Sequence, residues 1–545
     1  MTGSQLIARI LKKEGIEQVF CFPYTPIIES LAEEEIRIIV ARQERVAENM
    51  ADGFSRTTFG KNIGVVTVQQ AAGAENAFAG IAQAYTDSSP ILFLPGHPGR
   101  SRTGVPSVFD AVRNYSATTK WADTIPSAND VSNRMRRAFT TLRSGRPGPV
   151  LLEVPVDVAK EKCTDQMDYR PVGRVRTAPD LDLIREAVKM LLTAEKPMIW
   201  AGQGVLYAEA TDELCELAEL LAAPVLSTLL GKSNFNERHP LALGAAGYSQ
   251  TALVGDYLNQ CDAIFAVGAS LTSTNFAPEL PVGSRLIHAT VDPKDLNKDA
   301  VPELGILGDA KLVLAAMIEE VRSQSGGKGR AGRSQVEQYL ADKRVAWKAY
   351  WAPKLNSSET PINPYRVIGD FMKSTDPANT IVTHDSGNPR DQLLPLYESI
   401  TPRGYLGWGH STQLGFSLGA TMGAKIAAPE KLAVNFMGDA AFGMVGMDIE
   451  TAVREEIPIL TMLLNNSAMG GYQKYIPKAV ERYGTKYLTG NYSEVARGLG
   501  AYTERIEQPS EIIPAIERAI TQTKEGKPVL LEFITCEEPD MAIRS

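Results

Sequence analysis

Short apolar runs alternate with longer helical patterns from one end of the sequence to the other. Apolar runs of about four to eight residues are typical of strands buried on both faces, and the segments between them are long enough for crossover helices. This alternation predicts an α/β fold of doubly wound parallel sheets, whose ligands bind beyond the carboxyl ends of the strands. The predicted strands are 36–40, 64–68, 91–94, 150–154, 198–201, 225–228, 263–267, 286–291, 380–383, 432–437, 457–464 and 529–533.

The predicted strands fall into three groups, and 545 residues are too many for one hydrophobic core. Residues 161–180 lose the apolar pattern, and residues 322–334 are polar and glycine-rich, as in a linker. We therefore expect three domains of this kind. Their predicted ranges are 1–165, 180–322 and 360–545.

The pentapeptide PVLLE occurs twice, at 149–153 and at 528–532, and closes the first and third predicted domains. Buried strands reuse Val and Leu, so the repeat can be a coincidence of composition. Alternatively, the two domains are related folds. The sequence pattern leaves both interpretations open.

Composition and charge exclude several classes of protein. The formal charge is −8, and no concentrated basic face is visible, so a nucleic-acid partner is not expected. The five cysteines lack CxxC or Cys/His spacing, which predicts neither a disulfide framework nor a zinc site and suits a reducing cytoplasm. No apolar stretch approaches the roughly eighteen residues of a membrane span. We expect a cytoplasmic protein without a membrane partner.

Two polar motifs follow neighbouring predicted strands in the third domain. Gly438-Asp439-Ala440-Ala441 comes after the strand at 432–437, and Asn465-Asn466 comes after the strand at 457–464. In a parallel sheet both motifs lie at the same edge. Carboxylate and amide oxygens suit Mg²⁺ or Ca²⁺, and a helix that starts after Gly438 directs N–H groups at a phosphate. The pair predicts a metal-bridged diphosphate site.

A glutamate in the first domain lies at a comparable edge. Val46, Met50 and Phe54 recur every four residues, which predicts a helix with one apolar face. Glu44 lies at the N-terminal end of this helix, just after a strand. The helix dipole alone favours a glutamate there, so its position does not by itself indicate function.

The motifs together resemble those of thiamine-diphosphate enzymes. Gly438-Asp439 followed by Asn465-Asn466 resembles the GDG…NN signature, with Ala440 in place of the second glycine. Residues 42–56, RQERVAENMADGFSR, resemble the RHEQGAAHAADGYAR segment of the acetohydroxyacid synthase and pyruvate oxidase group, and residues 64–90 resemble its next block. The resemblance covers essentially the whole chain, in the order pyrimidine, middle and diphosphate domain.

The resemblance implies specific roles for site residues. Glu44 would bond N1′ of the aminopyrimidine, Leu414 would be the wedge that bends the cofactor, and the Thr412 carbonyl would accept from its 4′-amino group. Asp439, Asn466 and the Ala468 carbonyl would hold Mg²⁺. His410 is either a site acid or base or an ordinary loop histidine. The other expected site residues are Gln70 on the catalytic side and, for cofactor binding, Asn76, Asn388, Arg390, Gly438, Ala440, Ala441 and Met469.

The substrate side departs from the family pattern. A tyrosine, Tyr24, replaces a glycine near the cofactor, and the family's FQE glutamine has no clear counterpart. The tryptophan that follows the NN motif in true synthases is absent, and Met469, Tyr472 and Lys474 stand there instead. The middle domain carries glycines at 202 and 204 but lacks the family's GxR arginine, so bound FAD is not expected.

The sequence thus predicts a thiamine-diphosphate- and Mg²⁺-dependent lyase or carboligase of the acetolactate synthase type. It would cleave a 2-oxo acid or 2-hydroxy carbonyl compound, then protonate the carbanion or pass it to an aldehyde or ketone. The resemblance implies a homodimer or homotetramer with active sites at the subunit interface. The alternatives are an acyl-CoA-handling lyase, of the 2-hydroxyacyl-CoA lyase or oxalyl-CoA decarboxylase type, and a catalytically silent scaffold.

Overall fold

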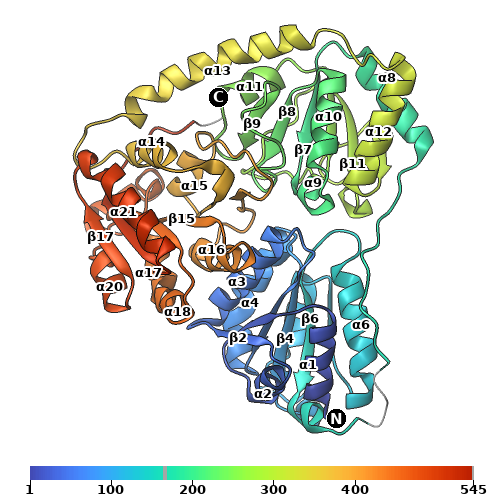
Figure 1. Ribbon diagram of the computed structural model, residues 1–545, viewed down its shortest axis with the longest axis vertical. Helices are drawn as coiled ribbons and strands as arrows, with labels where there is room; N and C mark the ends of the chain where they lie inside the picture. The colour runs from blue at the N-terminus through green and yellow to red at the C-terminus, as the bar shows by residue number, and fades with distance from the viewer. Residues whose placement is uncertain (164–167, 543–545) are drawn as a thin grey trace.

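The computed structural model describes residues 1–163 and 168–542 and contains three six-stranded sheets flanked by helices (Figure 1). Each sheet is parallel throughout, so the predicted α/β class is confirmed. The bodies around the sheets are called the N-domain (β1–β6), the middle domain (β7–β12) and the C-domain (β13–β18). The predicted domain ends at 165 and 545 lie outside the described residues.

The N-domain sheet has the order β2-β1-β3-β4-β6-β5. Its central strands β3, β4 and β6 are fully buried, because helices cover both faces. The strands are β1 (Gln18–Cys21), β2 (Arg37–Val40), β3 (Gly64–Val68), β4 (Ile91–His97), β5 (Trp121–Thr124) and β6 (Val150–Pro155); the α-helices are α1 (Gly3–Lys13), α2 (Thr25–Glu33), α3 (Glu44–Thr57), α4 (Ala72–Thr86), α5 (Ala111–Tyr115), α6 (Val131–Leu142) and α7 (Val156–Lys160).

The middle domain has the order β12-β11-β10-β7-β8-β9, which is the doubly wound order of dinucleotide-binding folds. A long helix, α13, leads from it to the C-domain (Figure 1). The strands are β7 (Pro197–Ala201), β8 (Val225–Thr228), β9 (Ala242–Ala246), β10 (Ala263–Val267), β11 (Arg285–Thr290) and β12 (Leu304–Leu307); the α-helices are α8 (Leu181–Thr193), α9 (Gln203–Ala208), α10 (Thr211–Leu221), α11 (Ala252–Leu258), α12 (Ala310–Ser325) and α13 (Arg333–Leu355).

The C-domain sheet has the order β14-β13-β15-β16-β18-β17. The chain leaves β13 first to one side and then to the other, so the topological switch point lies between β13 and β15. The strands are β13 (Thr380–His384), β14 (Tyr405–Leu406), β15 (Leu432–Gly438), β16 (Leu460–Asn465), β17 (Tyr502–Ile506) and β18 (Val529–Ile534); the α-helices are α14 (Pro364–Ser374), α15 (Asn388–Leu393), α16 (Phe416–Ala427), α17 (Asp439–Val445), α18 (Ile449–Arg454), α19 (Pro477–Tyr483), α20 (Tyr492–Gly498) and α21 (Ile512–Lys524).

The N-domain and the C-domain sheets share one topology. In both, the strands in chain order take the sheet positions second, first, third, fourth, sixth and fifth. The two PVLLE segments run into β6 and β18, each of which is the last strand of its domain in chain order and the fifth in its sheet. This correspondence favours related folds over a coincidence of composition.

Helix α3 of the N-domain packs directly on helix α16 of the C-domain, and glycines permit the close approach. A Cβ on Gly53 would lie 2.0 Å from the Ala420 carbonyl oxygen, and one on Gly423 would lie 1.9 Å from that of Met50. Both distances are impossible contacts, so these positions require glycine. The packing brings the helix that begins at Glu44 against the helix that follows Leu414. In the part of the chain that the structure describes, no helix is long and apolar enough to cross a bilayer.

Candidate active site

A cavity of about 250 Å³ opens at the carboxyl ends of β13, β15 and β16, beside the switch point of the C-domain sheet. This is where ligands of open α/β sheets bind. Ten of the predicted site residues line it: Asn388, Thr412, Leu414, Gly438, Asp439, Ala440, Ala441, Asn466, Ala468 and Met469.

Asp439 is the buried carboxylate of this cavity. It is the first residue of α17, and its Oδ1 accepts the N–H of Ala440 at 2.9 Å. Its Oδ2 is buried and has no hydrogen-bond partner among the described residues. Burial raises the pKa of Asp439 to about 6, against the lowering effect of nearby main-chain N–H groups. An unpartnered buried carboxylate oxygen is costly unless a cation or donor meets it.

The turn after β16 places two further oxygen donors beside Asp439. Asn466 Oδ1 accepts the N–H of Ala468 at 3.0 Å, and the N–H groups of Ser467 and Ala468 approach the Asp439 carboxylate. At the start of this turn, the Asn465 side chain donates to the fully buried Glu532 of β18 at 2.7 Å, and this hydrogen bond anchors the turn to the sheet. The donor set of carboxylate, amide and carbonyl oxygens fits Mg²⁺. Asp439, Asn466 and the Ala468 carbonyl would hold the ion.

The loop that carries Thr412 and Leu414 is held by Asp385, a residue that the sequence analysis did not identify. This fully buried carboxylate follows β13 and accepts the N–H groups of Gly415 at 3.0 Å and Ser417 at 3.2 Å, together with the Ser417 hydroxyl. Burial raises the pKa of Asp385, and these donors oppose that rise. An aspartate two residues beyond the predicted strand at 380–383 was the available signal for it.

Glu44 and Asn76 form a second group, in the N-domain. Glu44 begins α3 and is buried, and the Asn76 side chain on α4 donates to its Oε2 at 3.3 Å. Gln70 is half-buried in the turn before α4, where Ala71 adopts a left-handed φ of 54°. Glu44, Asn76 and Gln70 do not line the C-domain cavity of their own chain.

One helical turn beyond Glu44 lies a second buried acid, Glu48. Glu48 is fully buried, and neither carboxyl oxygen has a hydrogen-bond partner among the described residues. A Cβ on Gly80 of α4 would lie 2.2 Å from Glu48 Oε2, so the missing side chain at Gly80 makes the space for this carboxyl. Burial raises the pKa of Glu48 well above its usual value, the approach of the Ile81 main-chain N–H opposes that rise, and the charge of Glu44 adds to it.

The structure places Arg390 and His410 outside the C-domain cavity. The Arg390 guanidinium pairs with Asp391 at 2.7 Å and lies over the ring of Phe276. His410 lines a separate cavity between the N-domain and the middle domain, and its main-chain N–H donates to the Asp87 carboxylate at 3.3 Å. Burial lowers the pKa of His410. The catalytic and cofactor roles of these two residues stay predictions.

The glycines of the middle-domain GxG turn have a packing role. A Cβ on Gly202 would lie 2.2 Å from the Gly268 carbonyl oxygen, and one on Gly204 would lie 2.7 Å from the Gly268 Cα. Strand β7 and helix α9 therefore approach the turn after β10 too closely for any side chain.

Tyr24, which replaces the family's glycine, also has a packing role. Its ring packs against Gly96 in the N-domain core, and its hydroxyl donates to the Val154 carbonyl at 3.3 Å.

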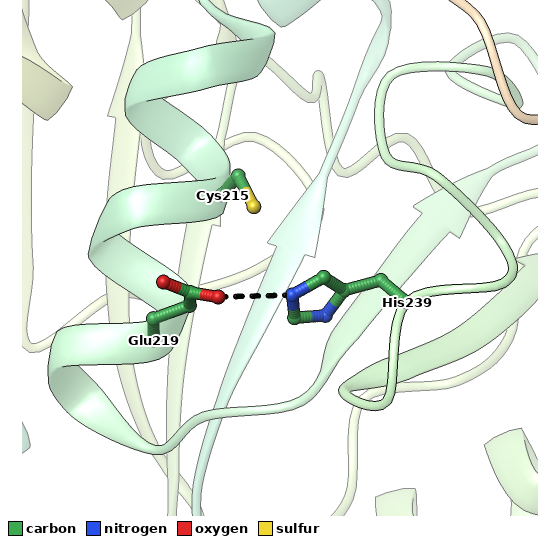
Figure 2. Close-up of side chains that lie close together, drawn as sticks. All are labelled: Cys215, Glu219 and His239. Atoms are coloured by element: carbon green, nitrogen blue, oxygen red, sulfur yellow. Dashed lines mark hydrogen bonds and ion pairs between the residues drawn. The ribbon is translucent and has the colours of Figure 1, made fainter.

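Cys215 and Glu219 of α10 face His239 across a short gap, with ligand atoms within 4.8 Å of one another (Figure 2). His239 Nδ1 accepts the N–H of Leu241 at 3.1 Å, so Nε2 carries the hydrogen and donates to Glu219 at 3.2 Å. A metal-bound histidine instead donates from its second nitrogen. Arg333 pairs with the same Glu219 oxygen at 2.8 Å, and burial raises the pKa of the Cys215 thiol. The geometry fits a hydrogen-bonded cluster better than a metal site.

Comparison with known proteins identifies the family. Three family models match in order: the N-terminal TPP binding domain of thiamine pyrophosphate enzymes over residues 1–121, their central domain over 184–317, and their C-terminal TPP binding domain over 385–533. The matches therefore fall on all three sheets.

Similar curated proteins share one description. The chain is 29% identical to a probable acetolactate synthase large subunit of Methanocaldococcus jannaschii, over 98% of this chain and 92% of that protein. It is 28% identical to the acetolactate synthase isozyme 3 large subunit of Escherichia coli, over 98% of this chain and 94% of that protein. The chain belongs to the thiamine pyrophosphate enzymes and, within them, to the acetolactate synthase group.

Proposed function

We propose that this enzyme binds Mg²⁺ and thiamine diphosphate in the C-domain cavity, cleaves a 2-oxo acid and joins the resulting fragment to a second carbonyl compound. The observation that carries the proposal is the buried, unpartnered Oδ2 of Asp439 beside Asn466 and Ala468. A site of three oxygen donors at a sheet switch point suits a metal-bound diphosphate. The name acetolactate synthase, borne by the relatives, supports this reaction class.

In this proposal each cavity residue has a defined task. Asp439, Asn466 and the Ala468 carbonyl would hold the ion, and the Leu414 side chain would support the bound cofactor as its apolar wedge. Bound thiamine diphosphate supplies a nucleophilic carbon and an electron sink for C–C cleavage. The Thr412 carbonyl accepts a hydrogen bond from the 4′-amino group. Glu44 holds the proton at N1′, a general acid–base task that requires short contact.

The position of Glu44 supports a site completed by a second copy of the chain. Glu44 does not line the cavity of its own chain, whereas its neighbourhood exposes large apolar side chains. Phe78 and Tyr85 on α4 are 37% and 41% exposed, and Met444 and Met447 are 48% and 47% exposed. Exposed large apolar side chains that gather on one surface typically mark an interface. We propose a homodimer or a dimer of dimers; the relatives' description as large subunits supports assembly with a further chain.

Gln70 and His410 are the remaining proposed site residues, and the state of the cysteines bears on the cellular compartment. Gln70 supplies an amide donor at the turn before α4, and His410, which lines the cavity between the N-domain and the middle domain, is kept as the proposed acid or base of the site. Cys21, Cys215, Cys261 and Cys536 are free thiols, which supports a reducing compartment, the cytoplasm.

Incubation with pyruvate, Mg²⁺ and thiamine diphosphate tests the proposal. Acetolactate and carbon dioxide in a molar ratio of about one to one support it, because each ligation consumes two pyruvates and releases one carbon dioxide. Turnover of a 2-hydroxyacyl-CoA but not of pyruvate would reassign the enzyme to the acyl-CoA lyases. Tight cofactor binding without turnover of either substrate would favour the scaffold alternative.

A further inference from the structure

A cavity of about 370 Å³ lies beneath α13 and shares no lining residue with the C-domain cavity. Helix α13 forms one wall, and the other walls come from β9 and the loop before it in the middle domain and from α14 and residues 395–398 in the C-domain. Figure 1 shows α13 passing from one domain to the other above this region. The volume lies at the lower end of the range of small-molecule pockets.

The α13 wall of this cavity is aromatic. Trp347 and Trp351 meet edge to face with ring centroids 5.6 Å apart, and Leu355 continues the wall by one more turn. Leu243 and Met372 face it from the middle domain and the C-domain. Rigid aromatic walls bind apolar groups at a low cost in conformational entropy.

One cation at this cavity lacks a carboxylate partner. Arg344 Nη2 donates to the carbonyl oxygens of Ala242 at 2.9 Å and of His239 and Pro240 at 3.4 Å. It makes no ion pair with any carboxylate in residues 1–163 and 168–542. The nearby Glu398 is already neutralised.

Two other cations neutralise that carboxylate. Arg238 pairs with Glu398 at 3.1 Å and Lys348 pairs with it at 2.7 Å. Burial lowers the pKa of the Arg344 guanidinium, which reports the cost of keeping its charge there. The rim of the cavity is therefore cationic and lies beside an apolar wall. A bound anion would offset the free-energy cost of burying the Arg344 charge.

We propose that this cavity is a second ligand site, specific for a small organic anion with an apolar body. The carboxylate or sulfonate of the ligand pairs with Arg344, and its ring or chain packs on Trp347 and Trp351. The ligand contacts the middle domain, α13 and the C-domain at once, so it stabilises the arrangement of these parts by binding to the folded state. The site is separate from the residues that hold Mg²⁺ and thiamine diphosphate.

The probe for a test is 8-anilinonaphthalene-1-sulfonate, an apolar anion whose fluorescence rises in apolar surroundings. The full-length enzyme is first saturated with Mg²⁺ and thiamine diphosphate, so that the active site is filled. We expect one saturable site per chain, with energy transfer from tryptophan to the bound probe. Trp347→Phe should reduce the transfer and leave the affinity nearly unchanged.

Three substitutions on α13 make the test specific. Arg344→Gln should weaken binding by about tenfold, because it removes a charge-assisted contact. Ala352→Phe keeps the charge but fills the cavity and should weaken binding at least as much. Lys343→Gln is the matched control, because Lys343 pairs with Asp256 at 2.7 Å and does not line the cavity. Equal probe affinity in the Ala352→Phe and Lys343→Gln enzymes, or no saturable binding to the wild type, overturns the proposal.

Discussion

The carboxylate of Asp385 accepts the main-chain N–H of Gly415 at 3.0 Å, and Gly415 follows the predicted cofactor wedge, Leu414, directly. One buried side chain at the end of β13 thus fixes the loop that faces the C-domain cavity. The same carboxylate accepts the N–H and the hydroxyl of Ser417 at the start of α16. The position of Leu414 therefore depends on a residue that lies outside the recognised motifs.

Replacing Asp385 with Asn should lower both stability and activity. The amide NH₂ would face donors, so at least one buried N–H group would lose its acceptor, at a cost of about 1–3 kcal/mol. Thermal melting and kcat with saturating cofactor measure the two effects. Asp376→Asn is the control, because Asp376 caps a short 3₁₀ turn at an exposed position. Full activity in Asp385→Asn would contradict the role assigned to this carboxylate.

The raised pKa of Asp439, about 6, predicts how metal affinity depends on pH. Below that pH the carboxyl is protonated, and Mg²⁺ must displace the proton. The apparent affinity should therefore fall by about tenfold for each pH unit below 6 and become flat above about 7. Titration of Mg²⁺ into the apoenzyme from pH 5 to 8 measures this. An affinity that is constant over that range would remove Asp439 as a metal ligand.

Glu48 should make the apoenzyme less stable as the pH rises. Its pKa is raised in the folded state, so the folded protein binds the proton more tightly than the unfolded chain does. The stability contribution is present below the unfolded pKa of about 4.3 and is lost at about 1.4 kcal/mol per pH unit until the folded carboxyl ionises. Glu48→Gln lacks this dependence.

Denaturant unfolding of both proteins from pH 4.5 upward checks the Glu48 prediction. The free-energy difference between Glu48→Gln and wild type should increase with pH in favour of the variant. The exposed Glu29→Gln change is the control and should leave the slope unchanged. Parallel curves for wild type and Glu48→Gln would mean that Glu48 finds a compensating partner in the folded protein.

A shared active site predicts complementation between two inactive variants. Glu44→Gln damages the N-domain half of the site, and Asp439→Asn damages the C-domain half. If the halves meet across a dimer interface, co-expressed chains form mixed dimers with one intact site each, which gives roughly a quarter of wild-type activity at random assortment. Activity no higher than that of either variant alone would place both halves in one chain.

The strands that the sequence pattern missed share a position in the fold. The pattern predicted three of the four interior strands of the N-domain sheet, β3, β4 and β6, and it overlooked both edge strands of each of the other two sheets. An edge strand has one neighbour and is short, as in β14 (Tyr405–Leu406), so it lacks the continuous apolar run of a buried strand. Only β1 was an interior strand without a recognised run.

The site was predictable where polar motifs follow strands and less so where function depends on packing. Asp439 and Asn466 stand directly after apolar runs, so their common edge follows from parallel topology. Asp385 and Glu48 act through burial and through neighbours that are distant in sequence, such as Gly415 and Gly80. A single sequence does not encode those contacts in a local pattern. His410 falls near Leu414 in sequence but lines a different cavity.

The role of Glu44 is tested by the exchange of the C2 proton of enzyme-bound thiamine diphosphate with D₂O, in wild type and in Glu44→Gln. Calorimetry on the same samples establishes that both proteins bind Mg²⁺ and the cofactor. Cofactor affinity should be similar in the two proteins, and the exchange rate should be lower by about 10²-fold or more in Glu44→Gln, since general acid–base groups contribute about that much. Equal exchange rates in the two proteins would contradict a role of Glu44 in proton transfer.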